Sequence, residues 1–242
     1  VALMGAFSAQ AATVVDFDTD SAGNTLTAGT AITNQYAADG VTFHQMDTKI
    51  QGSSTELSDL MVFDSANPTG GDDDLATNPG YHSTNTVNLG NVLIISEDND
   101  SSDPDDQANG GRFFVQLDPS KQYKVDNVTF LDIEDKRASG EARTINNSTF
   151  FALFDSSQNQ IGSNYWVTGL GDNSVETLSV DVSGAEFMSF SFHTSGALAG
   201  FELTSEAVAA SEPAALALMS LGLAGLMITR RRNRALEDQR SH

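Results

Sequence analysis

The body of the chain consists of short segments in which apolar and polar residues alternate, and it lacks long helical patterns. Phe, Val, Thr and Tyr recur at every second position of these segments, which places them on one face of a β-strand. Clusters of Gly, Asn, Asp and Ser separate the segments and are typical of turns. The segments are VVDFD (14–18), GVTF (40–43), LMVFD (60–64), NVLIIS (91–96), RFFVQL (112–117), YKVDNVTFLDIE (123–134), STFFALFD (148–155), NYWVTGL (164–170), VETLSVDVS (175–183), EFMSFSFHTS (186–195) and AGFELTS (199–205). The pattern predicts an all-β domain over residues 12–206, an antiparallel β-sandwich or jelly roll, with one short helix around Ile32–Ala37 as an ambiguous addition.

Charge restricts the classes of partner. The formal net charge is −21, from 33 acidic and 12 basic residues. A surface this acidic repels phosphates, which argues against nucleic acid as a partner. High net charge also marks disordered chains, but 39% apolar residues, including 14 Phe, are enough to build a core. The absence of Cys excludes disulfides, Cys–zinc sites and thiol catalysis.

Two loops, residues 63–80 and 96–112, are dense in carboxylates. Calcium takes roughly six to eight oxygen ligands, often from flexible loops of this composition. Crowded aspartates also repel one another unless something neutralises them. The candidate calcium ligands are Asp64, Asp72, Asp73, Asp74, Asp98, Asp100, Asp103, Asp105 and Asp106. The alternative is solvated charge that keeps the protein soluble.

Aromatic residues supply candidate sugar contacts. Tyr165 and Trp166 lie next to each other in a predicted strand, and aromatic rings stack on the faces of sugars. The alternative for a lone Trp in a strand is a place in the core. Tyr81 and His82, beside the first acidic loop, form a second candidate pair.

Signals for an enzyme are poor. No nucleophile elbow, zinc-protease motif or phosphate-binding glycine loop occurs, and the four His are scattered. Asp132, Glu134 and Asp135 are the carboxylates that could serve glycoside hydrolysis. Strand alternation instead predicts that they face outward, so we expect a protein that is not an enzyme.

Both ends of the sequence carry apolar segments. Residues 1–11 end in Ala9-Gln10-Ala11, an A-x-A cleavage pattern, and are interpreted as the remnant of a secretory signal peptide. The alternative is a native N-terminal strand. Near the other end, after a linker at 207–210, residues 214–229 form a 16-residue apolar run. As a helix it would be about 24 Å long, shorter than the ~30 Å core of a bilayer.

The C-terminal region resembles the PEP-CTERM sorting signal. Ser211, Glu212 and Pro213 precede the single hydrophobic helix at 214–229, and Arg230, Arg231 and Arg232 open a basic cluster that extends to residue 234 and is followed by the tail 235–242. The family's usual tripeptide is Pro-Glu-Pro, so Ser211 departs from it. The resemblance implies export in a Gram-negative bacterium, a membrane-held intermediate through residues 214–229, processing by exosortase, and delivery to the cell surface or the extracellular matrix. The family is often linked to exopolysaccharide and biofilm.

A second resemblance concerns the body. The segment FSFHTSGALAGFEL (190–203) is similar to the last two strands of jelly-roll carbohydrate-binding modules. Taken together, these features favour an exported, non-enzymatic protein that is stabilised by calcium and binds or embeds in extracellular polysaccharide. The alternatives are a purely structural surface protein without a specific ligand, and a glycan-active enzyme.

Overall fold

The computed structural model describes residues 12–49, 53, 55–134 and 137–206. This part of the chain is all-β and contains two 3-10 turns, Ala37–Asp39 and Asp73–Leu75, as its helical elements. Its strands are β1 (Ala12–Val15), β2 (Val41–Gln45), β3 (Leu60–Asp64), β4 (Asn91–Ile95), β5 (Gly111–Leu117), β6 (Gln122–Leu131), β7 (Phe150–Phe154), β8 (Gln160–Trp166), β9 (Val175–Ser183), β10 (Phe187–Phe192) and β11 (Ala197–Glu206).

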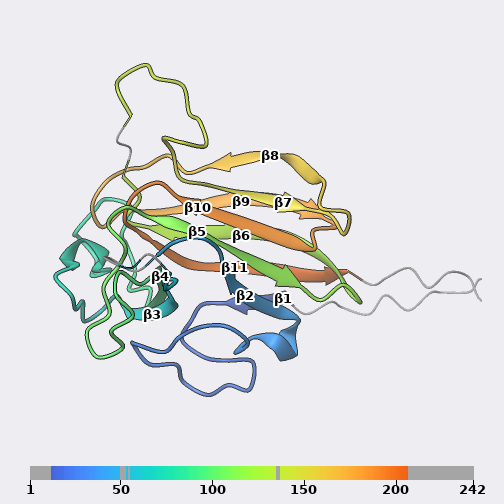
Figure 1. Cartoon of the computed structure of the whole chain (residues 1–242), viewed down its shortest axis with the longest axis horizontal. Coiled ribbons are helices and arrows are strands. Elements are labelled where there is room, and N and C mark those ends of the chain that lie inside the picture. The colour runs from blue at the N-terminus through green and yellow to red at the C-terminus, as the bar shows by residue number, and fades with distance from the viewer. Residues whose placement is uncertain (1–11, 50–52, 54, 135–136, 207–242) are drawn as a thin grey trace, which may run out of the picture. The chain divides into compact units, whose positions relative to one another are not determined.

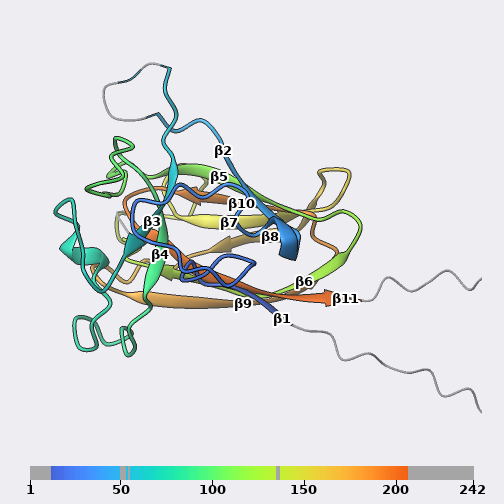
Figure 2. The ribbon, with the colours of Figure 1, turned by 90° about the horizontal axis from the view of Figure 1, so that it is seen from below.

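The strands from β4 to β11 follow the order of a jelly roll. One sheet contains the order β4-β11-β6-β9 and the other contains β5-β10-β7-β8, with antiparallel neighbours throughout. The chain crosses repeatedly from one sheet to the other, so its connections gather at the two ends of the sandwich. Figure 1 shows the strands and their connections, and Figure 2 shows the sheets as two layers, with β5 and β10 in one and β9 and β11 in the other. The predicted antiparallel jelly roll is confirmed.

Three further strands extend this arrangement. β3 adds to β4, β2 adds to β5, and β1 pairs with β11. β11 serves two partners along one edge, because Leu198 pairs with β4 whereas Thr204 pairs with Ala12 of β1. Gly200 lies between the two partners, and a Cβ there would meet the Val15 carbonyl oxygen at 2.4 Å. The position at which β11 changes its partner from β4 to β1 therefore requires glycine.

Alternate residues of both sheets face inward and form one core. Phe113 and Phe190, on neighbouring strands of the five-stranded sheet, stack with their ring centroids 4.9 Å apart. Phe130 of the opposite sheet contacts Phe190 at 6.2 Å and Phe151 at 6.0 Å. All four side chains are buried. Offset and tilted ring pairs of this kind add to the free energy gained from burying apolar area.

β3 and β4 are buried on both faces. One face joins the main core, and the other forms a smaller cluster in which Phe63 and Ile94 pack with Leu75. Leu75 belongs to the 3-10 turn of the 63–80 loop, so this loop is held against the sheet by an apolar contact. The double burial explains why these two strands appear in the sequence as continuous apolar runs without alternation.

Every predicted strand segment overlaps a strand in the structure, but β1 and β8 both begin earlier than predicted, β1 at Ala12 instead of residue 14. The sequence predicted a strand at 164–170, whereas β8 spans Gln160–Trp166. The first half of β8 contains Gly162, and a glycine among polar residues resembles a turn in the sequence. In the structure Gly162 has a φ of +73°, which suits a bulge within the strand. The predicted helix near Ile32–Ala37 corresponds to the single 3-10 turn Ala37–Asp39.

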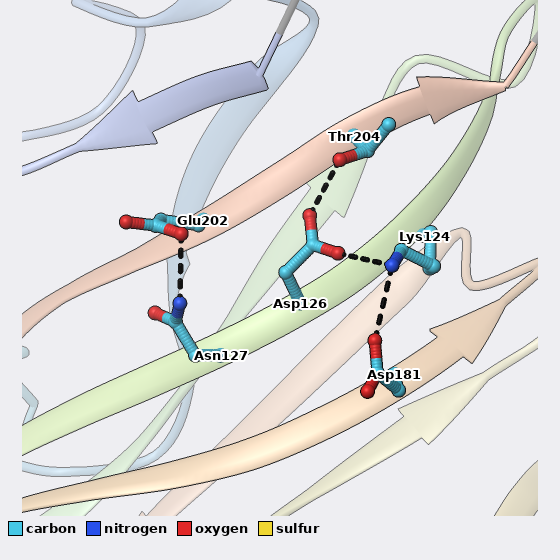
Figure 3. Close-up of polar contacts among 6 residues, drawn as sticks. All are labelled: Lys124, Asp126, Asn127, Asp181, Glu202 and Thr204. Carbon is cyan, nitrogen blue, oxygen red and sulfur yellow. Dashed lines mark hydrogen bonds and ion pairs between the residues drawn. The ribbon is translucent and has the colours of Figure 1, made fainter.

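The outward face of the six-stranded sheet is polar and charged. Lys124 of β6 forms ion pairs with Asp126 at 2.5 Å and with Asp181 of β9 at 3.0 Å (Figure 3). Asn127 donates a hydrogen bond to Glu202 of β11 at 2.8 Å. Ion pairs in contact with solvent contribute little to stability, so these contacts are typical of a solvated surface.

The tail predicted to be a sorting signal lies outside the described residues. Residues 207–242, which include this tail, are not described by the structure. Residues 1–11 are likewise outside the description. Among the residues that are described, no helix has the length and apolar character needed to cross a membrane.

Candidate functional site

A hollow of about 600 Å³ opens at one end of the sandwich. β5 begins there and β10 ends there, whereas Ala12 and its partner Thr204 lie toward the opposite end. Connections from both sheets form its wall. The residues that line it are Asp47, Thr48, Lys49, Gln107, Asn109, Gly110, Gly111, Arg112, Ile145, Ser191, Phe192 and His193.

Arg112 and Asp47 form a charged pair at the rim of this hollow. The Arg112 Nε donates to Asp47 Oδ1 at 3.2 Å, and a second contact joins Nη2 to Oδ2. The side chains are 52% and 56% exposed, so the pair adds little to stability. The hydrogen bond from Arg112 lowers the pKa of Asp47, which keeps this carboxylate ionised. A guanidinium has five N–H groups, so most of its donors stay available to a ligand.

A close contact between a loop and β5 sets the position of this pair. The Arg112 backbone N–H donates to Thr48 Oγ1 at 3.0 Å, which holds the residue next to Asp47 against the strand. A Cβ at Gly111 would meet the same hydroxyl at 2.2 Å. Glycine at this position therefore lets the loop approach closely enough for Asp47 to reach the guanidinium.

Hydrogen bonds also order the rest of the wall. Gln107 is buried and donates through Nε2 to the Lys49 carbonyl oxygen at 3.3 Å, while its backbone N–H donates to Ile95 at 2.8 Å. The His193 backbone N–H donates to Thr149 Oγ1 at 3.1 Å, which ties the end of β10 to the start of β7. His193 is one of the residues that line the hollow. The wall thus offers amide, imidazole, carboxylate and guanidinium groups on an ordered frame.

The hollow also has an apolar side. Ile145, from the long connection between β6 and β7, is 63% exposed, which is unusual for a large aliphatic side chain. Phe192 of β10 also lines the hollow, although its ring is buried in the core against Phe113 and Phe130. A ligand that combines apolar patches with many hydroxyl groups suits this mixture.

The two acidic loops lie side by side next to the hollow. The Asp106 backbone N–H donates to Asp72 Oδ2 at 2.7 Å, and the Gly70 N–H donates to Asp103 Oδ1 at 2.9 Å. Asp106 is buried, and its Oδ2 accepts a short hydrogen bond from the Gly196 N–H. Asp106 immediately precedes Gln107 of the pocket wall. The loops therefore form the support behind this wall.

Burial raises the pKa values of several carboxylates in these loops. Desolvation, reinforced by neighbouring carboxylates, raises the pKa of Asp72 and of Asp105 to about 6 and that of Asp106 to about 7. The pKa of Asp74 is raised for the same reasons. The mutual repulsion that the sequence indicated is thus present in the folded loops.

The calcium candidates do not converge on one point. Within the described ranges, no group of three or more His, Asp or Glu side chains is placed to hold a metal ion. Asp64, Asp98 and Asp100 instead accept hydrogen bonds from backbone N–H groups two residues ahead, as turn caps do. Asp73 and Asp74 form the 3-10 turn of the first loop. Calcium binding accordingly stays a prediction.

The two aromatic candidates face opposite sides of their sheet. Tyr165 points inward and stacks on Phe151, with ring centroids 4.7 Å apart. Trp166 is half-buried on the outward face, where its ring lies 5.0 Å from that of Phe150. Of the two, Trp166 has the position that a sugar contact requires.

The other residues that the sequence singled out lie elsewhere. Tyr81 is 59% exposed, and His82 Nδ1 lies 2.8 Å from Thr84 Oγ1; neither residue lines the hollow. The expectation that Asp132 faces outward is wrong, because this residue is 1% exposed and accepts a hydrogen bond from the Asn173 N–H at 2.8 Å. Burial raises its pKa to about 8. Its positive φ, +60°, shows that the strand alternation has ended there.

Sequence reasoning missed the pocket residues. Arg112, Asp47 and His193 belong to three different segments and match no motif. One usable signal was present: Arg112 is the sole Lys or Arg in the residues assigned to the five strands of this sheet.

Comparisons with known proteins give no family. No protein-family model matches the chain, and no curated protein matches it. Similar solved structures include a fucose-binding module from Streptococcus pneumoniae (25% identity, 42% of this chain, 68% of that chain, TM-score 0.26). The lectin-binding domain of lectinolysin complexed with Lewis b is another (14% identity, 42% and 70%, TM-score 0.27). A third is the C-terminal domain of a chitobiase from Bacteroides fragilis (16% identity, 43% and 65%, TM-score 0.23). The fold assignment rests on the strand order of the chain itself.

Proposed function

We propose that this protein binds carbohydrate, without chemical conversion, in the hollow at the end of the jelly roll where β5 begins and β10 ends. The observation that carries the proposal is the pairing of Arg112 with Asp47 beside an exposed Ile145. A charged pair supplies donors and acceptors for vicinal hydroxyl groups, and the aliphatic side chain covers an apolar sugar face. Binding sites for small polar ligands combine these features.

A catalytic role has less support. Glycoside hydrolysis uses two carboxyl groups that flank the scissile bond, about 5–10 Å apart. Among the described residues that line the hollow, Asp47 is the one carboxylate, and Arg112 lowers its pKa. A general acid needs a raised pKa, so Asp47 is suited to accepting hydrogen bonds from a ligand and unsuited to donating a proton.

The test is a glycan array followed by calorimetry on the best ligand. Arg112→Ala should weaken binding about tenfold or more, since hydrogen bonds to charged groups are worth ~1.5–3 kcal/mol. The matched control is Lys124→Ala, which removes a cation with similar ion pairs from the outward face of the other sheet. Equal affinity of the two variants would contradict the assignment of the site.

We further propose, from the sequence, that the protein is exported and reaches the cell surface or matrix after processing of its tail. Ser211, Glu212 and Pro213, with Arg230 to Arg232 beyond the apolar run, support this route. The membrane enzyme exosortase and extracellular polysaccharide are the partners that it implies. Mass spectrometry of the protein from its native host should find a C-terminus before Ala214. A C-terminus beyond Arg232 would exclude the processing step.

Calcium binding by the acidic loops is a separate proposal. The raised pKa values of Asp72, Asp105 and Asp106 support it, because a cation would relieve the repulsion that causes part of those shifts. The described side chains do not converge into a ligand set, so binding requires a local rearrangement of the loops. A purely structural role without any ligand is the alternative, and a negative glycan array would favour it.

A further inference from the structure

The two sheets differ in charge to an unusual degree. The strands of the five-stranded sheet read VTFHQ, GRFFVQL, FMSFSF, FFALF and QIGSNYW, and they contain no Asp or Glu. The chain as a whole has 33 acidic residues. The six-stranded sheet carries acids on its outward face, among them Asp126, Asp181 and Glu202 (Figure 3). Solubility alone would favour acids on both outward faces, so the neutral sheet requires a specific explanation.

The outward face of the neutral sheet carries aromatic rings. His44 stacks on Phe114 with ring centroids 4.5 Å apart, Phe187 approaches Phe114 at 6.5 Å, and Phe150 lies beside Trp166. Each of these side chains is half-buried. By strand alternation the same face also carries neutral hydrogen-bonding groups, including those of Thr42, Gln116, Gln160, Asn164 and Ser189. Aromatic rings interleaved with hydroxyl and amide groups form a surface for a ligand that is both apolar and hydroxyl-rich.

This face is continuous with the hollow. Arg112 pairs with Ser191, Ser191 pairs with Phe150, and Phe150 pairs with Trp166, so the four residues form one row across β5, β10, β7 and β8. Arg112 and Ser191 also line the hollow. Three strand spacings of about 4.8 Å separate the first residue of the row from the last, or ~14 Å in total. A ligand that leaves the hollow along this row passes over Phe150 and reaches Trp166.

A second copy of the chain is a less suitable occupant. Each copy carries a formal net charge of −21, so two copies repel each other at moderate salt. Stable homodimer interfaces also have a largely apolar core, whereas here the rings are separated by polar side chains. A neutral partner avoids the charge repulsion, and a hydroxyl-rich partner can bond to the groups between the rings.

We infer that the outward face of the five-stranded sheet is a platform for an extended neutral polysaccharide, one sugar unit of which occupies the hollow. This inference rests on the proposed function and specifies its ligand: a polymer without carboxylate or sulfate groups, bound along the row from Arg112 to Trp166. The hollow holds one unit through directed hydrogen bonds, and the platform adds affinity with each further unit that contacts a ring.

Trp166 is the sole Trp of the chain, so its fluorescence reports on the far end of the platform alone. The probes are ladders of one to six β-linked glucose, mannose or N-acetylglucosamine units. For the ladder that binds, the hexasaccharide should shift the emission to the blue and protect Trp166 from acrylamide, whereas the single sugar should bind without either effect. Affinity should rise with length, and Trp166→Ala should reduce the hexasaccharide affinity by about tenfold.

Two controls separate a failure of the platform from a failure of the pocket. Trp166→Phe keeps a ring and should retain most of the gain with length, and Ser179→Ala, on the outward face of the other sheet, should match the unaltered protein. If single sugars and hexasaccharides bind equally well and neither protects Trp166, the platform is wrong and the pocket stands. If a single sugar protects Trp166 fully, the assigned order of the subsites is wrong. If no ladder and no neutral polymer binds, both proposals fail.

Discussion

Gly111 is the residue on which the geometry of the pocket depends most directly. Its missing side chain lets Thr48 lie against β5, and a Cβ there would come within 2.2 Å of Thr48 Oγ1. We expect Gly111→Ala to lower the free energy of unfolding by about 1–3 kcal/mol, the range for overpacking a tight contact. Because Asp47 moves with Thr48, glycan affinity should fall as well. Chemical denaturation and calorimetry measure the two effects, and unchanged values of both would contradict this account.

Asp106 predicts how stability depends on pH. Its pKa in the folded protein is about 7, raised first by burial and then by Asp72, Asp74 and Asp105, against about 3.9 in an unfolded chain. The folded state therefore binds the proton more tightly, and the free energy of unfolding should fall as the pH rises from about 4 through 7. Asp106→Asn, which cannot titrate, should be more stable than the unaltered protein at pH 8, by on the order of 2 kcal/mol.

The control for this prediction is Asp155, an aspartate whose pKa is lowered in the folded protein instead of raised. Hydrogen bonds from Asn159 and Ser157 lower the pKa of Asp155, so its contribution to stability is present at both pH 5 and pH 8 and is lost in acid. Asp155→Asn should therefore change stability equally at the two pH values. If the free energy of unfolding depends on pH in the same way in Asp106→Asn as in the unaltered protein between pH 5 and pH 8, groups other than Asp106 cause that dependence.

The sequence predicts features that depend on neighbouring residues, such as strands and turns. It does not predict contacts between residues that are far apart in the chain. The outward direction of Trp166 and the inward direction of Tyr165 follow once a register is known, but the sequence does not supply the register. Asp47 follows β2 in a segment that lies against the start of β5, where it reaches Arg112. No local motif near either residue predicts this contact. Asp132 departed from the expected alternation because its left-handed backbone turns the side chain inward.

At the scale of elements, the acidic loops at 63–80 and 96–112 act as one unit, joined by the hydrogen bond from the Asp106 N–H to Asp72. The predicted calcium would neutralise the same carboxylates that protons neutralise in acid. Millimolar calcium should therefore raise the melting temperature clearly at pH 8 and much less at pH 5, where the raised pKa values leave the loops partly protonated. Magnesium at the same concentration is the control for ionic strength. Equal shifts with the two cations would point to screening alone.

Strand prediction succeeded because the elements are short, alternating and separated by turn residues, which are local properties. It was displaced at β1 and at β8, and at β8 the cause is the irregularity at Gly162, which breaks the alternation. The sequence identified the two acidic loops, but it did not show that they lie next to each other. Their contact depends on β3 and β4 pairing at the edge of one sheet, and pairing between strands is not encoded in a local pattern.

For the whole molecule, the separation of charge between the sheets predicts which polymers the protein binds and how salt affects this. A neutral polysaccharide gains no Coulomb energy from the acidic surface, so its affinity should be nearly the same at 20 mM and 500 mM salt, concentrations whose screening lengths differ by roughly fivefold. Acidic polymers such as alginate should be repelled at low salt, because the five-stranded sheet offers one cation, Arg112, in a molecule of net charge −21. Affinity electrophoresis in gels containing dextran, curdlan or alginate measures both the choice of polymer and the effect of salt on binding. Retardation by alginate at low salt that disappears at high salt would mean that the ligand is anionic, and the neutral platform would then be abandoned.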